Sequence, residues 1–133
     1  MAKKRIFAGS VGEPPEGTWS NCLVVDDRVY IAGMTSRSDE FDRIDGDNAF
    51  EQARIIFDKI KALVEAAGGS MADVVRVNVF LANINDRDQV WEARRMFFEG
   101  DFPVSTLLQV GALVHPDMLV EIEAEAILGA GAD

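Results

Sequence analysis

The chain has 133 residues and a formal net charge of −10, because 23 Asp and Glu residues outnumber 13 Lys and Arg. Its single Cys excludes an internal disulfide, and one Cys with one His make a poor zinc-ligand set. The acidic balance argues against a nucleic-acid partner, because phosphate binding depends on Lys and Arg. No apolar run approaches a membrane span, and no signal peptide is recognisable. We expect a single cytoplasmic domain over residues 1–133, with no cofactor, metal or membrane partner.

The N-terminal part of the chain is predicted to form strands. A loop rich in Gly and Pro covers residues 9–18, and a short strand around Arg5–Ala8 is an option that the sequence leaves open. Residues 19–34 contain two β-rich runs separated by Asp26 and Asp27, which tolerate turn conformations. This segment predicts a β-hairpin.

The clearest predicted helix follows an exposed acidic loop over residues 36–47. Apolar residues recur at three- and four-residue spacing from Phe50 to Ala67. Asn48 with Glu51 three residues later resembles a capping box, and Gly68 follows the last apolar position as a stop.

Two strands and a second helix are predicted in the C-terminal half, after a strand over Val74–Leu81. The helix is expected from Asn85–Asp86 to Gly100, and the strands over Thr106–Ala112 and Val120–Ala126. In the last strand, apolar residues alternate with Glu121, Glu123 and Glu125. The buried stripe of the second helix is expected to consist of Val90, Ala93 and Phe97, with Met96 beside it.

The resulting order, β-β-α-β-α-β-β, predicts an α+β fold in which both helices pack on one face of a single sheet. The other face would then carry apolar residues such as Val74, Phe80 and Leu107. A face of this kind is usually buried in an oligomer, so an oligomer is expected.

Several segments together resemble one known family. They are Gly17-Thr18-Trp19, Ile31-Ala32-Gly33, Val64–Gly68, Phe102-Pro103 and Val120–Ala124. They resemble the Rid family, also called the YjgF/YER057c/UK114 family, whose best-known branch is the enamine/imine deaminases. The resemblance runs over nearly the whole chain. It implies a chorismate-mutase-like fold that assembles as a homotrimer with ligand sites in the clefts between subunits.

The resemblance also implies site residues. Glu121 corresponds to the glutamate that positions water, and Gly33 to the glycine that contributes its backbone. Trp19 stands where the family has a tyrosine, so the phenol hydroxyl is lost. Trp91 stands where an asparagine is common. These substitutions alter the walls of the expected pocket.

The largest departure from the family pattern is at Ser105, which with Thr106 is expected to donate hydrogen bonds to a substrate carboxylate or carbonyl. In the deaminase branch an arginine occupies this position and holds the substrate carboxylate through its planar fork. Arg95 is the last basic residue of the chain, so no later Lys or Arg replaces it. Arg37 is the first candidate for a substitute cation and Arg76 the second.

Three functional hypotheses follow. The leading one is a deaminase-like hydrolase for a small enamine, imine or related reactive metabolite, with a specificity different from that of the 2-aminoacrylate deaminases. The second is a non-catalytic trimer that binds a small metabolite. The third, a ribonuclease or translation inhibitor, is disfavoured because the acidic chain would repel RNA. Glu123 and Glu125 are expected to be structural, and Cys22 lacks a base other than the turn residue His115.

Overall fold

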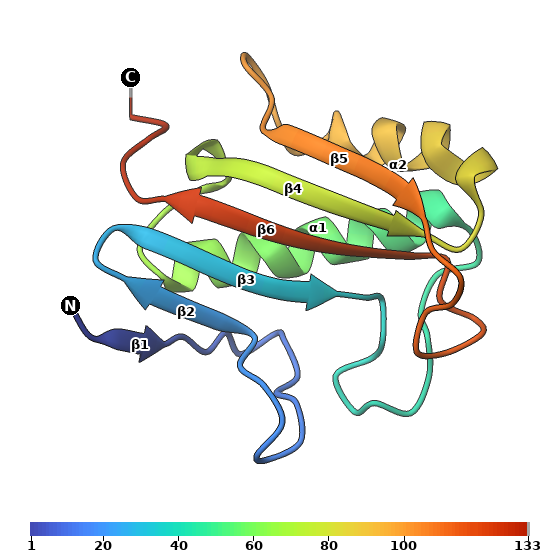
Figure 1. Ribbon diagram of the computed structural model, residues 1–133, viewed down its shortest axis with the longest axis horizontal. Helices are drawn as coiled ribbons and strands as arrows, with labels where there is room; N and C mark the ends of the chain where they lie inside the picture. The colour runs from blue at the N-terminus through green and yellow to red at the C-terminus, as the bar shows by residue number, and fades with distance from the viewer. Residues whose placement is uncertain (133) are drawn as a thin grey trace.

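The computed structural model describes residues 1–132, in which a six-stranded sheet carries both α-helices on one face (Figure 1). No helix among these residues is long and apolar enough to cross a membrane. The strands are β1 (Lys3–Arg5), β2 (Cys22–Val25), β3 (Arg28–Met34), β4 (Val74–Leu81), β5 (Val104–Gln109) and β6 (Val120–Ile127). The helices are α1 (Ala49–Ala66) and α2 (Arg87–Arg94), with short 3₁₀ turns at Met71–Asp73 and Ile84–Asp86.

The strand order in the sheet is β1-β2-β3-β6-β4-β5. The last strand therefore lies between β3 and β4 and pairs antiparallel with both. β5 pairs only with β4, in parallel, and leaves a free edge. The expected α+β class with two helices on one face is confirmed, and the predicted hairpin is present as β2 and β3.

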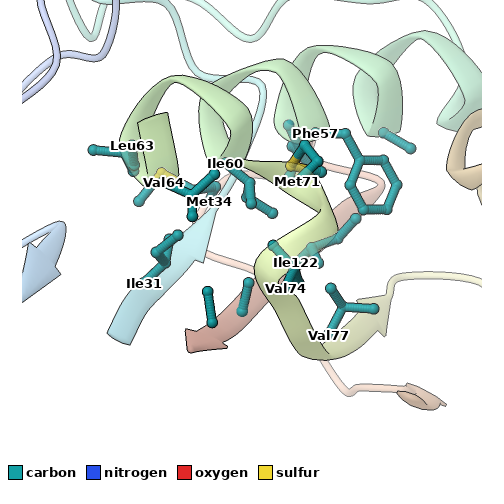
Figure 2. Close-up of a cluster of buried hydrophobic side chains, with 14 of the residues drawn as sticks. Ile31, Met34, Phe57, Ile60, Leu63, Val64, Met71, Val74, Val77 and Ile122 are labelled. Atoms are coloured by element: carbon teal, nitrogen blue, oxygen red, sulfur yellow. The ribbon is translucent and has the colours of Figure 1, made fainter. Parts of the chain in front are cut away.

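Helix α1 forms where the apolar spacing predicted it. Asn48 caps its first turn by accepting a hydrogen bond from the Glu51 amide at 2.9 Å. At its end Gly68 adopts a φ of 99°, and the amide of Gly69 donates to the Val64 carbonyl at 2.9 Å. Its apolar face packs on the sheet to form the core, as Figure 2 shows. The largest core side chains from α1 are Phe57, Ile56, Ile60 and Leu63.

Three predicted elements have different bounds in the structure. The first strand is Lys3–Arg5 rather than Arg5–Ala8, β5 is Val104–Gln109 rather than Thr106–Ala112, and α2 ends at Arg94 rather than near Gly100. After α2 the consecutive Phe97 and Phe98 both pack on Phe57, with ring centroids 5.4 and 5.8 Å away. The α-helical bonding gives way to tighter turns here, since the amides of Met96 and Phe97 donate to the carbonyls of Ala93 and Arg94, three residues back, at 3.0 Å. Met96, expected beside the buried stripe, is 60% exposed.

The open face of the sheet also differs from expectation. The pairing of β4 with β6 shifts between Val74 and Arg76, and this irregularity turns Val74 into the core. Leu107 likewise packs against the core. The exposed apolar side chains of β5 are Val104 and Leu108, at 59% and 40% exposure. An apolar open face therefore remains. Phe80 lies on it as predicted, beside Leu108, whereas Val74 and Leu107 do not.

Candidate functional site

Gly33 and Glu121 come together where β3 and β6 pair. The register of these strands shifts between Ile31 and Met34, next to Gly33. A Cβ atom on Gly33 would lie 2.5 Å from Glu121 Oε2 and 2.9 Å from its carboxyl carbon. Only a residue without a side chain lets this carboxylate lie against the β3 backbone. The family resemblance had named the same two residues without showing that they touch.

The Glu121 carboxylate is a proton acceptor without a partner of its own. Burial raises its pKa above the ordinary value, and the neighbouring charge of Glu123 adds to the effect. Glu123 accepts a hydrogen bond from Asn78 Nδ2 at 3.2 Å. Glu121 makes no such bond within residues 1–132, so both of its oxygens remain available to a water molecule or a ligand.

Glu121 faces a small pocket, of about 110 Å³, between three loops. The loops follow β1, β3 and β5, and Figure 1 shows the last two close together at one end of the sheet. Four of the residues predicted for the site line this one pocket: Trp19, Gly33, Arg37 and Glu121. Trp19 is 52% exposed and forms part of the rim.

Two cations border the same pocket. The Arg37 guanidinium lies 5.4 Å from the centre of the Phe41 ring, a cation–π geometry that restrains the side chain. Lys59 of α1 donates to the carbonyls of Thr35 and Arg37 at 2.7 and 2.6 Å. Burial lowers the pKa of Lys59. The ammonium thus ties the loop that bears Arg37 to helix α1.

Three of the predicted site residues lie outside the pocket of Glu121. Ser105 and Thr106 belong to β5, and Trp91 to α2. Glu121 pairs with Phe80 on β4, and Phe80 pairs with Leu108 on β5, three residues beyond Ser105. Two strand spacings and three residues of rise give roughly 14 Å between the Cα atoms of Glu121 and Ser105. The predicted residues therefore form two groups, one around the pocket of Glu121 and the other on α2 and β5.

Sequence reasoning missed two cations. In the sequence, Lys59 is only a polar residue on the predicted helix, and nothing in the pattern places it at a site. Arg94 reaches Ser105, with Nη2 donating to Oγ at 3.1 Å, although 11 residues separate them in the sequence. Arg76, the second candidate for a substitute cation, lies in a groove of the open face beside Glu123 and Glu125, away from the pocket of Glu121.

The cysteine is not placed for nucleophilic catalysis. Cys22 is fully buried, and this burial raises the pKa of its thiol to about 11. A thiol with this pKa remains protonated near neutral pH. His115 instead accepts a hydrogen bond from the Asp117 amide, at 3.0 Å, within its own turn.

Comparison with known proteins gives a consistent family match. A family model described as endoribonuclease L-PSP matches residues 11–128. The chain is 30% identical to a 2-iminobutanoate/2-iminopropanoate deaminase of Dermatophagoides farinae, over 96% of this chain and 99% of that one. It is 32% identical to a RutC family protein of Pyrococcus abyssi, over 95% and 98% of the two chains.

Solved structures share the fold of this chain. A Pseudomonas aeruginosa protein of unknown function superposes with a TM-score of 0.86 at 39% identity, covering 96% of this chain and 94% of that one. Escherichia coli TdcF, solved with bound serine, superposes with a TM-score of 0.83 at 28% identity, covering 93% and 98%.

Proposed function

Because the chain belongs to the endoribonuclease L-PSP family, which includes the Rid and YjgF/YER057c/UK114 proteins, we propose that it is a deaminase-like hydrolase of a small enamine or imine. The observation that carries the proposal is the carboxylate of Glu121, held over Gly33 without a hydrogen-bonding partner among the described residues. Relatives at about 30% identity bear the name 2-iminobutanoate/2-iminopropanoate deaminase.

Glu121 has the properties that imine hydrolysis requires of a base. In this reaction a water oxygen bonds to the imine carbon, and the water gives up a proton to the carboxylate. The carboxylate returns this proton to the nitrogen as the C=N double bond becomes single, which gives a carbinolamine. The hydroxyl proton of the carbinolamine then moves to the nitrogen, the C–N bond breaks, and ammonia leaves a carbonyl product. The raised pKa of Glu121 brings the carboxyl group closer to the pH at which it can both accept and return a proton.

We further propose that the complete site lies between subunits of a homotrimer, as the resemblance implies. Trp19, Gly33, Arg37 and Glu121 line one pocket, whereas Trp91, Ser105 and Thr106 lie on α2 and β5. The Cα atoms of Glu121 and Ser105 lie roughly 14 Å apart, farther than a four-carbon acid extends, so we infer that a neighbouring copy supplies the second group. The exposed Val104 and Leu108 on β5 offer apolar surface for that contact.

The specificity is proposed to differ from that of 2-aminoacrylate deaminases. Ser105 and Thr106 offer neutral hydroxyls where an arginine would make a charge-assisted pair, and the difference is about 1–2 kcal/mol per contact. A substrate carboxylate therefore requires a cation from elsewhere. Arg37 lines the pocket of Glu121 and is the first candidate.

A non-catalytic trimer that binds a small metabolite is the second candidate. It is favoured by Trp19, which has no phenol hydroxyl, and by the bound serine in the TdcF structure. RNA cleavage is disfavoured by the net charge of −10. We retain a cytoplasmic location as the expectation from the sequence.

The test uses 2-aminoacrylate generated in situ, with pyruvate release as the readout. The parent protein is expected to accelerate release weakly, and the S105R variant to gain activity. Acceleration by the parent as large as that of an arginine-bearing deaminase would refute the proposed role of Ser105. Binding without turnover across a panel of enamines would favour the second candidate. A stable monomer in sedimentation would overturn the trimer.

A further inference from the structure

A second pocket at the edge of the sheet has an unusual charge for this protein. It lies between α2 and the segment before β5, and its lining consists of Trp91, Arg94, Arg95 and Phe102. Each of the other four described pockets includes at least one Asp or Glu. The lining of this pocket has two arginines and no acid, so its charge is positive, whereas the net charge of the chain is −10.

The Arg94 guanidinium is half-buried without a countercharge. Among residues 1–132 no carboxylate lies within 4.0 Å of it. Its only hydrogen-bonding partner there is the neutral Ser105 hydroxyl, and its buried Nε has no partner. A guanidinium presents five N–H donors, and burial without an anion disfavours its charge. Burial accordingly lowers the pKa of Arg94. An anion bound here would relieve that cost.

The walls of the pocket indicate what kind of anion would fit. Trp91 and Phe102 are 36% and 42% exposed, so their rings are accessible to a ligand. Aromatic rings bind flat or apolar groups, and the arginine fork matches a carboxylate. An inorganic anion would use only the arginines and leave the rings without contact.

We propose that Arg94, assisted by Arg95 and the Ser105 hydroxyl, binds the carboxylate of an organic acid whose apolar part lies against Trp91 and Phe102. The cation comes from α2 and reaches across to β5. Arg94 is thus a specificity-determining residue, and an acid with an apolar or aromatic body binds better than a short one.

This inference deepens the proposed function, since it gives the substrate carboxylate to Arg94 in place of Arg37 and makes the imine substrate a 2-imino acid with an apolar side chain. Only its consequence for turnover rests on the proposed hydrolase function, because a stable acid can bind without being hydrolysed. Binding and turnover are therefore measured separately.

The binding test titrates the full chain with phenylacetate, phenylacetamide and acetate by calorimetry. Phenylacetate is expected to bind at least tenfold more tightly than phenylacetamide, which has the same shape without the charge. It is also expected to bind more tightly than acetate, and more weakly as salt is raised. R94Q should weaken phenylacetate binding roughly tenfold or more, and R94K should recover only part of it because the fork is lost.

The matched control is R87Q, which removes one positive charge from the first turn of the same helix, where Arg87 donates to the Ile84 carbonyl. R87Q is expected to bind phenylacetate as the parent does. The inference is overturned if the parent fails to bind phenylacetate, if R94Q and R94K bind it as the parent does, or if R87Q weakens binding as much as R94Q. Near-ultraviolet circular dichroism confirms folding of each variant.

The two proposals fail in distinguishable ways. If phenylacetate binding depends on Arg94 but no imine is hydrolysed, the hydrolase is wrong and the carboxylate site stands. If imine hydrolysis depends on Glu121 but neither binding nor KM responds to R94Q, the carboxylate site is wrong and the hydrolase stands.

Discussion

Substitution of Gly33 by Ala is expected to move the Glu121 carboxylate while it leaves the stability of the fold nearly unchanged. The new Cβ would lie 2.5 Å from Glu121 Oε2, closer than carbon and oxygen can approach. The conflict is with the end of a flexible side chain, so the carboxylate moves and the backbone stays. Gly33 does not have a positive φ, so Ala introduces no backbone strain there.

The expected magnitudes differ for stability and for rate. Pushing the Glu121 side chain about 30° away from its rotamer costs about 0.5–1.5 kcal/mol, a small loss for the fold. A displaced base loses its contribution to proton transfer, typically 10²–10⁴-fold in rate. We therefore expect G33A to lower imine hydrolysis about 100-fold while its free energy of unfolding falls by no more than about 1.5 kcal/mol.

The assay measures hydrolysis of 2-imino acids generated in situ, alongside thermal unfolding of the same samples. G111A is the matched control, because a Cβ on Gly111 meets nothing within 4 Å. It should leave both the rate and the unfolding temperature unchanged. Full activity in a folded G33A protein would refute the idea that contact with the β3 backbone places the Glu121 carboxylate for catalysis.

Two further predictions concern stability. The raised pKa of Glu121 means that the folded state holds this proton more tightly than the unfolded state, so ionisation disfavours folding above the ordinary pKa of 4.5. E121Q should therefore unfold at a higher temperature than the parent at pH 7, and this gain should shrink as pH falls to 4; a gain that grows toward pH 4 would contradict the assignment. Gln52 is buried and bonds to the backbone of Gly46, Asp117 and Leu119 at 3.3, 3.0 and 2.8 Å. Q52L leaves these groups without partners, and urea unfolding should show a loss of about 1–3 kcal/mol or more; an unchanged midpoint would show that water replaces all three bonds.

Much of the fold could be predicted from local patterns. The strand at Val74–Leu81 has the predicted bounds, and α1 begins and ends within a residue of its apolar stripe. Periodicity and capping are local properties of the chain, which is why they predict single elements well. The prediction that Val74 lies on the open face was wrong, because a register irregularity depends on the partner strand.

The order of strands in the sheet is not a local property. The last strand inserts between β3 and β4, whereas β5 pairs with β4 alone. No pattern within residues 104–127 distinguishes this arrangement from a hairpin of β5 and β6. Periodicity and the order of the elements predicted the α+β class with both helices on one face, and the family resemblance added the chorismate-mutase-like fold.

Some residues of the site could be predicted from the sequence, and others could not. Trp19, Gly33, Arg37 and Glu121 were named from the sequence and line one pocket. Arg94 was missed because it looks like an ordinary arginine on a helix surface, and only the placement of β5 beside α2 brings it to Ser105. No basic residue follows Arg95 in the sequence, and the two arginines proposed as substitute cations, Arg37 and Arg94, both lie earlier in the chain.

The central claim is that the Glu121 carboxylate is the base of an imine hydrolase. The most direct measurement is the rate at which E121Q releases ammonia and 2-oxo acid from 2-imino acids, beside E125Q, which neutralises a glutamate on the same face of β6. We expect E121Q to lose about 100-fold or more in rate and E125Q to match the parent. Equal rates for E121Q and the parent would contradict the claim.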